Sequence, residues 1–152
     1  LFNTYGPGEK YSEYRSVVAK FCYRALHDEP YHVYEDHHRS FTYVGDTVTT
    51  LANIVDNFIA GEVYNIGSGT RKSNVQVAKE ILSEVGASEE LITFVEDRPG
   101  HTKRYALDSS KVRNLGWEPR WSFPMALAET VKFYREHGCT TDVGLISSDS
   151  AE

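Results

Sequence analysis

Apolar residues recur at helical spacing along four stretches of the chain, and a proline or a glycine follows each of them. These stretches predict helices over residues 17–26, 46–60, 73–85 and 122–136, and a shorter helix over 108–115. Ser73 and Gln76 form the pattern of a capping box, and Gly86 is suited to end that helix. In the second helix, the face expected to pack against the core consists of Val48, Leu51, Ala52, Val55 and Ile59, with Asp46 as its N-cap.

Between the helices lie short runs of β-branched and aromatic residues, which predict strands. They cover residues 1–5, 31–34, 40–44, 62–66 and 91–95, and residues 35–39 are expected to form a polar loop. The predicted fold class is therefore α/β, or a mixed α+β lobe, because the strands are too few and too short for a complete doubly wound sheet.

Composition limits the classes of partner. The chain has 152 residues, a formal net charge of −6 and a pI near 5.5, which disfavours nucleic acid and anionic membrane surfaces. Cys22 and Cys139 lack metal-ligand and redox spacing, and there is no signal peptide, so a reducing cytoplasm is the expected compartment. We expect one domain over residues 1–138 and a disordered polar tail over 139–152.

The candidate chemistry is modest when each motif is taken alone. The turn Gly67-Ser68-Gly69 sits where a dinucleotide loop would, but Lys72 replaces the third glycine. His37-His38 has no third metal ligand at useful spacing, so we predict a solvated loop and no metal site. Asn65 stands equally between a phosphate or hydroxyl contact and a local backbone hydrogen bond, and Arg39 between an anion contact and a surface ion pair.

A second basic cluster, around Arg98-Pro99-Gly100-His101, is by composition a solvated loop, with an anion site as the functional alternative. No catalytic residue is predicted. None of the seven lysines has a tyrosine four residues earlier, so the Tyr-x-x-x-Lys pair that sets up a tyrosinate base is absent from these 152 residues.

Six motifs in a fixed order give a stronger indication. They are N-T-Y-G-P at 3–7, P-Y-H-V-Y at 30–34, R-S-F-T-Y-V-x-D at 39–46, Y-N-I-G at 64–67, R-P-G-H-x-x-R-Y-A-x-D-x-S-K at 98–111 and L-G-W-E-P at 115–119. Together they resemble the C-terminal part of the extended short-chain dehydrogenase/reductase family, the NAD-dependent nucleotide-sugar epimerases and dehydratases. The stretch 98–111 is most similar to nucleotide-sugar 4,6-dehydratases, notably those acting on dTDP-glucose.

The resemblance implies a nucleotide-sugar substrate, bound by Asn3, Val33, Tyr34, Arg39, Asn65, Arg98 and His101. In such enzymes the residues at the positions of Asn3 and Arg39 lie at the diphosphate, and that of Asn65 adds a phosphate or ribose contact. Val33 and Tyr34 correspond to residues that pack on the base, and Arg98 and His101 to residues that hold the phosphates and ribose. The family's NAD loop and Tyr-x-x-x-Lys pair precede the first motif. We therefore expect the N-terminal half of the Rossmann-type fold to be missing, NAD not to bind this chain alone, and the chain alone to be inactive.

Several alternatives stay open. The loop 35–38 reads Glu-Asp-His-His and is two residues shorter than is usual in the family, which leaves the nucleotide and the sugar undefined. The motif beginning at Arg39 fits UDP-glucuronate decarboxylases and C4-epimerases about as well. A stand-alone binding or dimerisation module, assembled as a homodimer, is the alternative of another class, and a truncated product without a role is a third.

Overall fold

The computed structural model describes residues 1–12, 14–34, 37–97 and 107–139. The helices are α1 (Val17–Leu26), α2 (Val44–Asn57), α3 (Asn74–Val85), α4 (Ser110–Arg113) and α5 (Phe123–His137), with a 3-10 turn at Glu89–Leu91. The strands are β1 (Thr4–Tyr5), β2 (Tyr31–Val33), β3 (His38–Ser40), β4 (Thr42–Tyr43), β5 (Arg71–Ser73) and β6 (Ile92–Phe94). None of the helices in these ranges combines the length and apolar character needed to cross a membrane.

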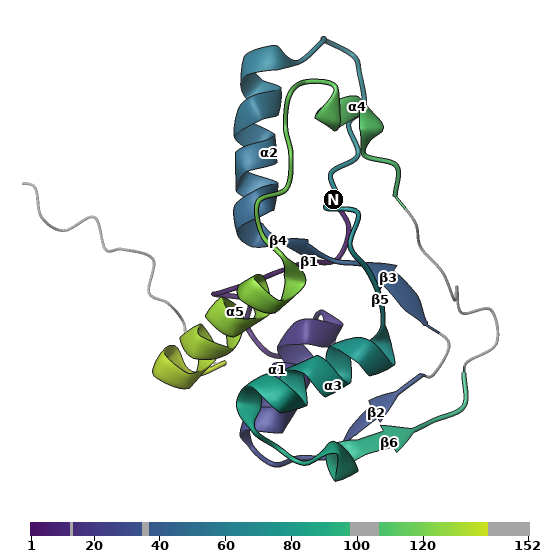
Figure 1. Cartoon of the computed structure of the whole chain (residues 1–152), viewed down its shortest axis with the longest axis vertical. Coiled ribbons are helices and arrows are strands. Elements are labelled where there is room, and N and C mark those ends of the chain that lie inside the picture. Colours follow the sequence, from purple (N-terminus) through teal and green to yellow (C-terminus); the bar gives the residue numbers. More distant parts are fainter. Residues whose placement is uncertain (13, 35–36, 98–106, 140–152) are drawn as a thin grey trace, which may run out of the picture.

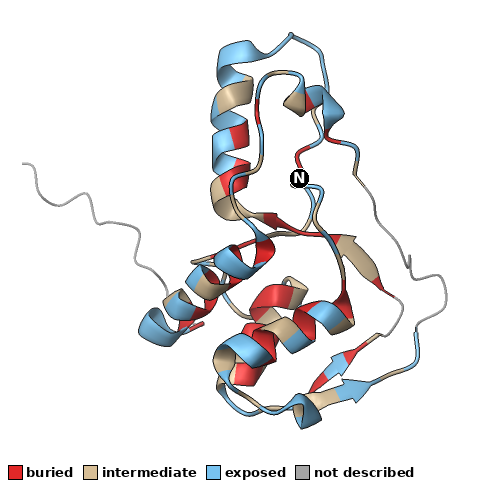
Figure 2. Cartoon of the chain, in the orientation of Figure 1, coloured by how far each residue is buried: buried red, intermediate tan, exposed pale blue. Residues whose placement is uncertain are grey.

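The core lies where α1, α3 and α5 pack together (Figures 1 and 2). Their apolar stripes face one another as the sequence predicts, and Val77, Ile81 and Leu82 of α3 are fully buried. Burying each such side chain contributes about 1.5–3 kcal/mol, so this three-helix contact is the main source of stability.

The ends of α3 also follow the sequence. The Ser73 hydroxyl accepts a hydrogen bond from the Gln76 backbone N–H at 3.0 Å, and the Gln76 side chain accepts from the Ser73 N–H at 2.8 Å. Gly86 ends the helix in the left-handed conformation, with φ at 79°. The predicted capping box and C-cap are confirmed.

Three two-stranded sheets surround this core. β1 pairs with β4 and β2 with β6, both in parallel, whereas β3 and β5 are antiparallel with Arg39 opposite Lys72. The sequence analysis predicted neither β3 nor β5, because polar residues in a three-residue strand carry no alternating pattern. The predicted strand at 62–66 was wrong as well: in the described chain this segment joins no ladder.

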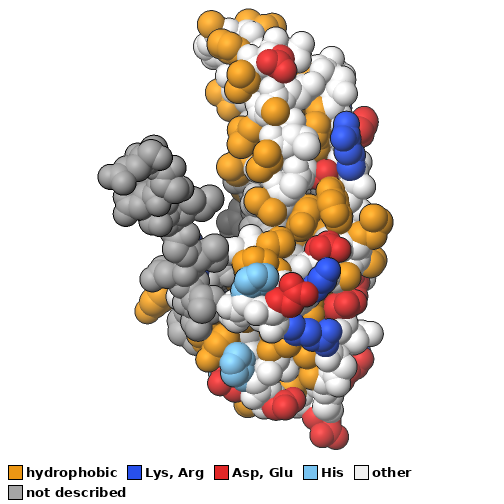
Figure 3. Space-filling model, turned by 90° about the vertical axis from the view of Figure 1, so that its left-hand side faces the viewer, with side chains coloured by type: hydrophobic (Ala, Val, Ile, Leu, Met, Phe, Trp, Pro, Cys, Tyr) orange, Lys and Arg blue, Asp and Glu red, His pale blue; other side chains and the backbone are white. Residues whose placement is uncertain are grey.

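The largest departure from prediction concerns α2. Its predicted inward face is exposed, with Leu51 45% and Val55 70% accessible, and the residues it buries are instead Asp46, Thr47 and Thr50. Figure 3 shows the resulting hydrophobic surface over the upper half of the molecule, where α2 lies. The periodicity identified an amphipathic helix correctly but not which of its faces this chain covers.

Polar contacts attach α2 to the rest of the chain. Asp46, predicted as the N-cap, lies in the first helical turn instead, and Tyr43 is the N-cap. The buried Asp46 carboxylate accepts hydrogen bonds from the backbone N–H groups of Arg120 at 2.9 Å and Trp121 at 3.4 Å. Trp117 Nε1 donates to Thr49 Oγ1 at 3.2 Å. These bonds join the helix to the segment that leads into α5.

Candidate functional site

Asn3 lies immediately before β1, with a backbone φ of 43°. Asparagine tolerates this left-handed region better than most residues. Its side-chain Nδ2 donates to the carbonyl of Ser40 at 3.0 Å, and its own carbonyl accepts from the Thr42 N–H at 3.3 Å. Asn3 therefore connects the start of β1 to the end of β3, beside Arg39.

Arg39 lies at the centre of β3, and its guanidinium contacts both of the histidines that precede it. Nη1 donates to the His38 carbonyl at 2.9 Å, and Nη2 donates to His37 Nδ1 at 3.2 Å. A guanidinium is always charged and presents its N–H groups in a planar fork that suits a phosphate. These two contacts fix the direction of that fork.

His37 was predicted to be solvated, and this is wrong: its side chain is only 1% exposed. The pairing of β3 with β5 draws the residue inward, because the Asn74 backbone N–H donates to the His37 carbonyl at 2.8 Å. His37 Nε2 lies 2.8 Å from Asp97 Oδ2, and the ring stacks on Tyr34 with centroids 5.1 Å apart. Sequence reasoning missed His37 and Asp97 as members of the site, since nothing local relates residues 60 positions apart.

The remaining predicted site residues are placed differently. Val33 is buried in the core, so Tyr34 alone of that pair offers partly exposed surface. Asn65 is exposed, three residues before Ser68, whose hydroxyl donates to the Phe41 carbonyl at 2.6 Å. Arg98 and His101 lie outside the described residues. The structure thus joins Asn3, Tyr34 and Arg39 through β3 and His37.

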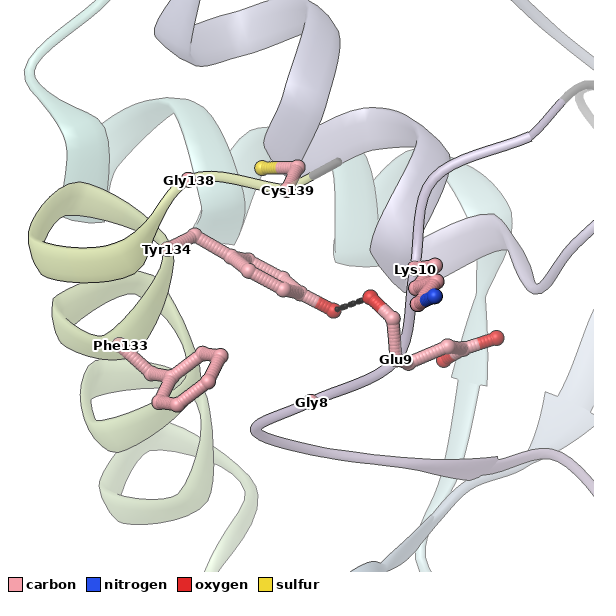
Figure 4. A pocket seen from close by; sticks show the side chains of 7 residues that line it. All are labelled: Gly8, Glu9, Lys10, Phe133, Tyr134, Gly138 and Cys139. Atoms are coloured by element: carbon pink, nitrogen blue, oxygen red, sulfur yellow. Dashed lines mark hydrogen bonds between the residues drawn. The ribbon is translucent and has the colours of Figure 1, made fainter. Parts of the chain in front are cut away.

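Two hollows lie near the first motif. An open pocket of about 330 Å³ is lined by the turn after β1, by Val44 and by the exposed Arg15. The second lies between residues 8–10 and the end of α5, where the Tyr134 hydroxyl donates to the Glu9 carbonyl at 2.8 Å (Figure 4). Cys139, the first residue of the predicted tail, is buried beside it, and its carbonyl accepts from the Tyr11 N–H at 2.8 Å. The second hollow is closed by bonds within the chain.

The Gly67–Gly69 turn packs against the segment around α4. A Cβ on Gly67 would lie 3.3 Å from Ser109 Oγ, and that hydroxyl donates to the Gly67 carbonyl at 2.8 Å. Arg113 Nη2 donates to the Ser68 carbonyl at 2.9 Å. The glycine here allows close packing against the residues before α4, and we assign no NAD contact to this turn.

Burial raises the pKa of Tyr5, Tyr31 and Tyr134 above the ordinary value for a phenol. A tyrosinate base requires a shift in the opposite direction. Within the described residues, no group of three His, Cys, Asp or Glu side chains is placed to hold a metal ion.

Comparison with known proteins gives the family. The sequence model of the GDP-mannose 4,6 dehydratase family matches residues 1–130. The low-salt glycan biosynthesis protein Agl12 of Haloferax volcanii is 42% identical over 134 residues, which is 87% of this chain and 42% of that protein. The dTDP-glucose 4,6-dehydratase of Streptomyces niveus is 36% identical over 138 residues, covering 89% of this chain and 40% of its own length.

Solved structures agree. The UDP-glucose 4-epimerase of Thermotoga maritima with UDP-glucose has a TM-score of 0.81 at 32% identity, over 89% of this chain and 44% of that one. The dTDP-glucose 4,6-dehydratase of Bacillus anthracis in complex with NAD has a TM-score of 0.78 at 31% identity, over 90% and 43%. The chain therefore belongs to the GDP-mannose 4,6 dehydratase family, among the NAD-dependent epimerases and dehydratases. It spans about two fifths of the length of the curated relatives it matches. The likeness to these solved structures confirms the predicted fold class.

Proposed function

We propose that this chain is the substrate-binding portion of an NAD-dependent nucleotide-sugar 4,6-dehydratase or epimerase. It binds the nucleotide diphosphate of a dTDP-, UDP- or GDP-sugar. The observation that carries the proposal is the family match over residues 1–130, which includes every residue of the predicted site. The proteins it resembles are named for dTDP-glucose dehydration and for UDP-glucose epimerisation.

In this proposal Arg39 is the principal diphosphate contact. Its fork-shaped guanidinium suits two phosphate oxygens, and its orientation is fixed by His37 and His38. Asn3 and Asn65 add contacts to the diphosphate or ribose, and Tyr34 packs on the base, supported from the core by Val33. Arg98 and His101 complete the set from the segment outside the described residues.

The catalytic groups and NAD are supplied, in this proposal, by a part of the enzyme outside these 152 residues, in the same or another chain. Two observations support this division of labour: the sequence has no Tyr-x-x-x-Lys pair, and burial raises the pKa of the core tyrosines. The chain alone is expected to have no dehydratase activity with added NAD and dTDP-glucose. Measurable turnover would refute this part.

Calorimetric titration tests the binding role. The panel is dTDP, UDP and GDP together with dTDP-glucose, UDP-glucose and UDP-glucuronate, which also separates the dehydratase, epimerase and decarboxylase alternatives. Arg39→Gln is expected to weaken binding more than about tenfold, since it removes a charged hydrogen-bond donor. Arg71→Gln, on the paired strand β5 and exposed, is the matched control and is expected to bind like the native chain.

The exposed apolar face of α2 indicates that this helix contacts a partner. Contiguous apolar surface of this kind is typical of interaction sites, and we assign it to the NAD-binding part of the enzyme, because relatives are more than twice as long as this chain. The second candidate function, a self-associating module, uses the same face for a second copy. Light scattering at several concentrations separates the two. A monomer that binds nucleotides supports the first, and a dimer indifferent to nucleotides supports the second.

A further inference from the structure

The environment of His37 determines which of its ring nitrogens carries the proton. Nδ1 lies 3.2 Å from Arg39 Nη2, and a guanidinium can only donate hydrogen bonds. Nδ1 must therefore accept, and the proton of a neutral imidazole must sit on Nε2. That nitrogen lies 2.8 Å from Asp97 Oδ2, and a carboxylate there accepts it. Both neighbours specify the same tautomer.

Hydrogen bonds connect Asp97 at the surface to His37, and His37 to Arg39 at the candidate anion site. Asp97 has a side chain 27% exposed, His37 is almost fully enclosed, and Arg39 lies one strand position beyond His38. Tyr34 stacks on the same imidazole at an interplanar angle of 29°. A rotation or a change of tautomer at His37 would thus disturb the guanidinium and the aromatic ring together.

We propose that His37 is a positioning residue for nucleotide binding, locked by Asp97 in the Nε2–H tautomer so that Nδ1 holds the Arg39 guanidinium and the ring supports Tyr34. This inference rests on the proposed function, because it takes Arg39 and Tyr34 as the diphosphate and base contacts. It adds two residues to the site, and neither of them needs to touch the ligand.

Removing the Asp97 side chain tests the inference, because the two explanations predict opposite changes in nucleotide affinity. Coulomb's law predicts that deleting a negative charge close to an anion site strengthens anion binding. Positioning predicts the reverse, because Asp97 then no longer orients the imidazole or holds its proton on Nε2. We expect Asp97→Ala to weaken binding of dTDP, UDP or GDP by about fivefold, the scale of one ordinary hydrogen bond.

Two further variants isolate the cause. Glu96→Ala removes the same charge from the exposed neighbouring position and is expected to leave affinity unchanged or slightly higher. Asp97→Asn removes the charge but keeps an oxygen that can accept from Nε2–H, and it is expected to retain most of the affinity. If Asp97→Ala binds as tightly as Glu96→Ala, or more tightly, the inference is wrong.

A second measurement does not depend on the ligand. The nitrogen shifts of ¹⁵N-labelled imidazole distinguish a protonated from an unprotonated ring nitrogen. We expect His37 in the native chain to show a protonated Nε2 and an unprotonated Nδ1, and Asp97→Ala to lose this pattern while circular dichroism stays unchanged. A native spectrum with the proton on Nδ1, or on both nitrogens, overturns the inference.

Different results would refute the proposed function and the positioning role of His37. If the native chain binds none of the three nucleotides, the proposed function fails and the positioning role fails with it. If the native chain binds and Arg39→Gln does not, while Asp97→Ala binds normally, the function stands and only the role of His37 is refuted.

Discussion

The helices α2 and α3 have similar apolar periodicity but opposite environments. In α3 the centre of the apolar stripe meets α1 and α5 and is fully buried, with only Val75 and Val85 at the ends of the helix partly exposed. In α2 the apolar stripe faces outward and the threonines face the chain. Periodicity therefore identifies an amphipathic helix and the face that would be favourable to bury, but it does not identify what buries it. The contrast divides the molecule into a core around α3 and a weakly attached helix with a surface suited to a partner.

A matched pair of leucine substitutions is the strongest test of this difference between α2 and α3. Leu82→Ala removes a side chain that is 0% exposed and is expected to cost about 3 kcal/mol in the free energy of unfolding. Leu51→Ala makes the same change on the open face of α2 and is expected to cost less than about 0.5 kcal/mol. Urea denaturation measures both. Equal losses would mean that the α2 face is covered in solution.

The attachment of α2 gives the next largest effect. Asp46→Ala leaves the backbone N–H groups of Arg120 and Trp121 without their buried acceptor and is expected to cost about 2 kcal/mol. Asp56→Ala removes an exposed acid near the C-terminal end of the same helix, where a negative charge opposes the helix dipole, and is expected to be neutral or slightly stabilising. A small loss at Asp46 would show that α2 is held by something else.

The capping box of α3 is expected to make a smaller contribution to the free energy of unfolding. Ser73→Ala removes the hydroxyl that caps α3 and is expected to cost about 1 kcal/mol, measured by thermal or urea unfolding. Ser83→Ala, an exposed serine within the same helix, serves as the control and is expected to change stability little, since alanine favours helix. If the two variants unfolded alike, the capping box would not contribute to stability.

The two thiols provide the mildest probe, and both belong to the core rather than to α2. Burial raises the pKa of the Cys139 thiol from 9.0 to about 11, and it raises that of Cys22 further. Because the folded chain favours the neutral thiol, the stabilising effect is complete below the unfolded pKa and is lost as the pH rises toward about 11. Urea midpoints across that range should fall less in Cys139→Ser than in the native chain, and identical curves would argue against burial of Cys139.

Where a local signal was complete, the fold could be predicted from the sequence. Ser73, Gln76 and Gly86 defined both ends of α3. The predicted start of the last helix at residue 122 agrees with the structure, in which Ser122 is the N-cap of α5 and accepts from the Met125 N–H. Pairing between distant segments could not be predicted. β3 and β5 are three residues long, polar and more than thirty positions apart, so no periodicity marks them.

The site divides in the same way. Arg39 was proposed from the sequence because arginine before a strand suits an anion and because its motif resembles that of a known family. The residues that orient it were not found: the bond from His37 to Asp97 spans 60 positions, and an imidazole in a polar stretch looks solvated until β3 encloses it. The roles of all the predicted site residues, that of Arg39 included, stay predictions.

The polar attachment of α2 has a consequence for how the native chain opens. Bonds through Asp46 and Thr49 hold this helix, with little apolar area buried on its inner face, so it is expected to detach as a cooperative unit below the cost of global unfolding. Its amide protons would then exchange with solvent through that partial opening, whereas those of α3 would exchange only through complete unfolding. A partner seated on α2 would slow the first exchange selectively, so the hydrogen-exchange profile of this one helix reports whether that surface is occupied.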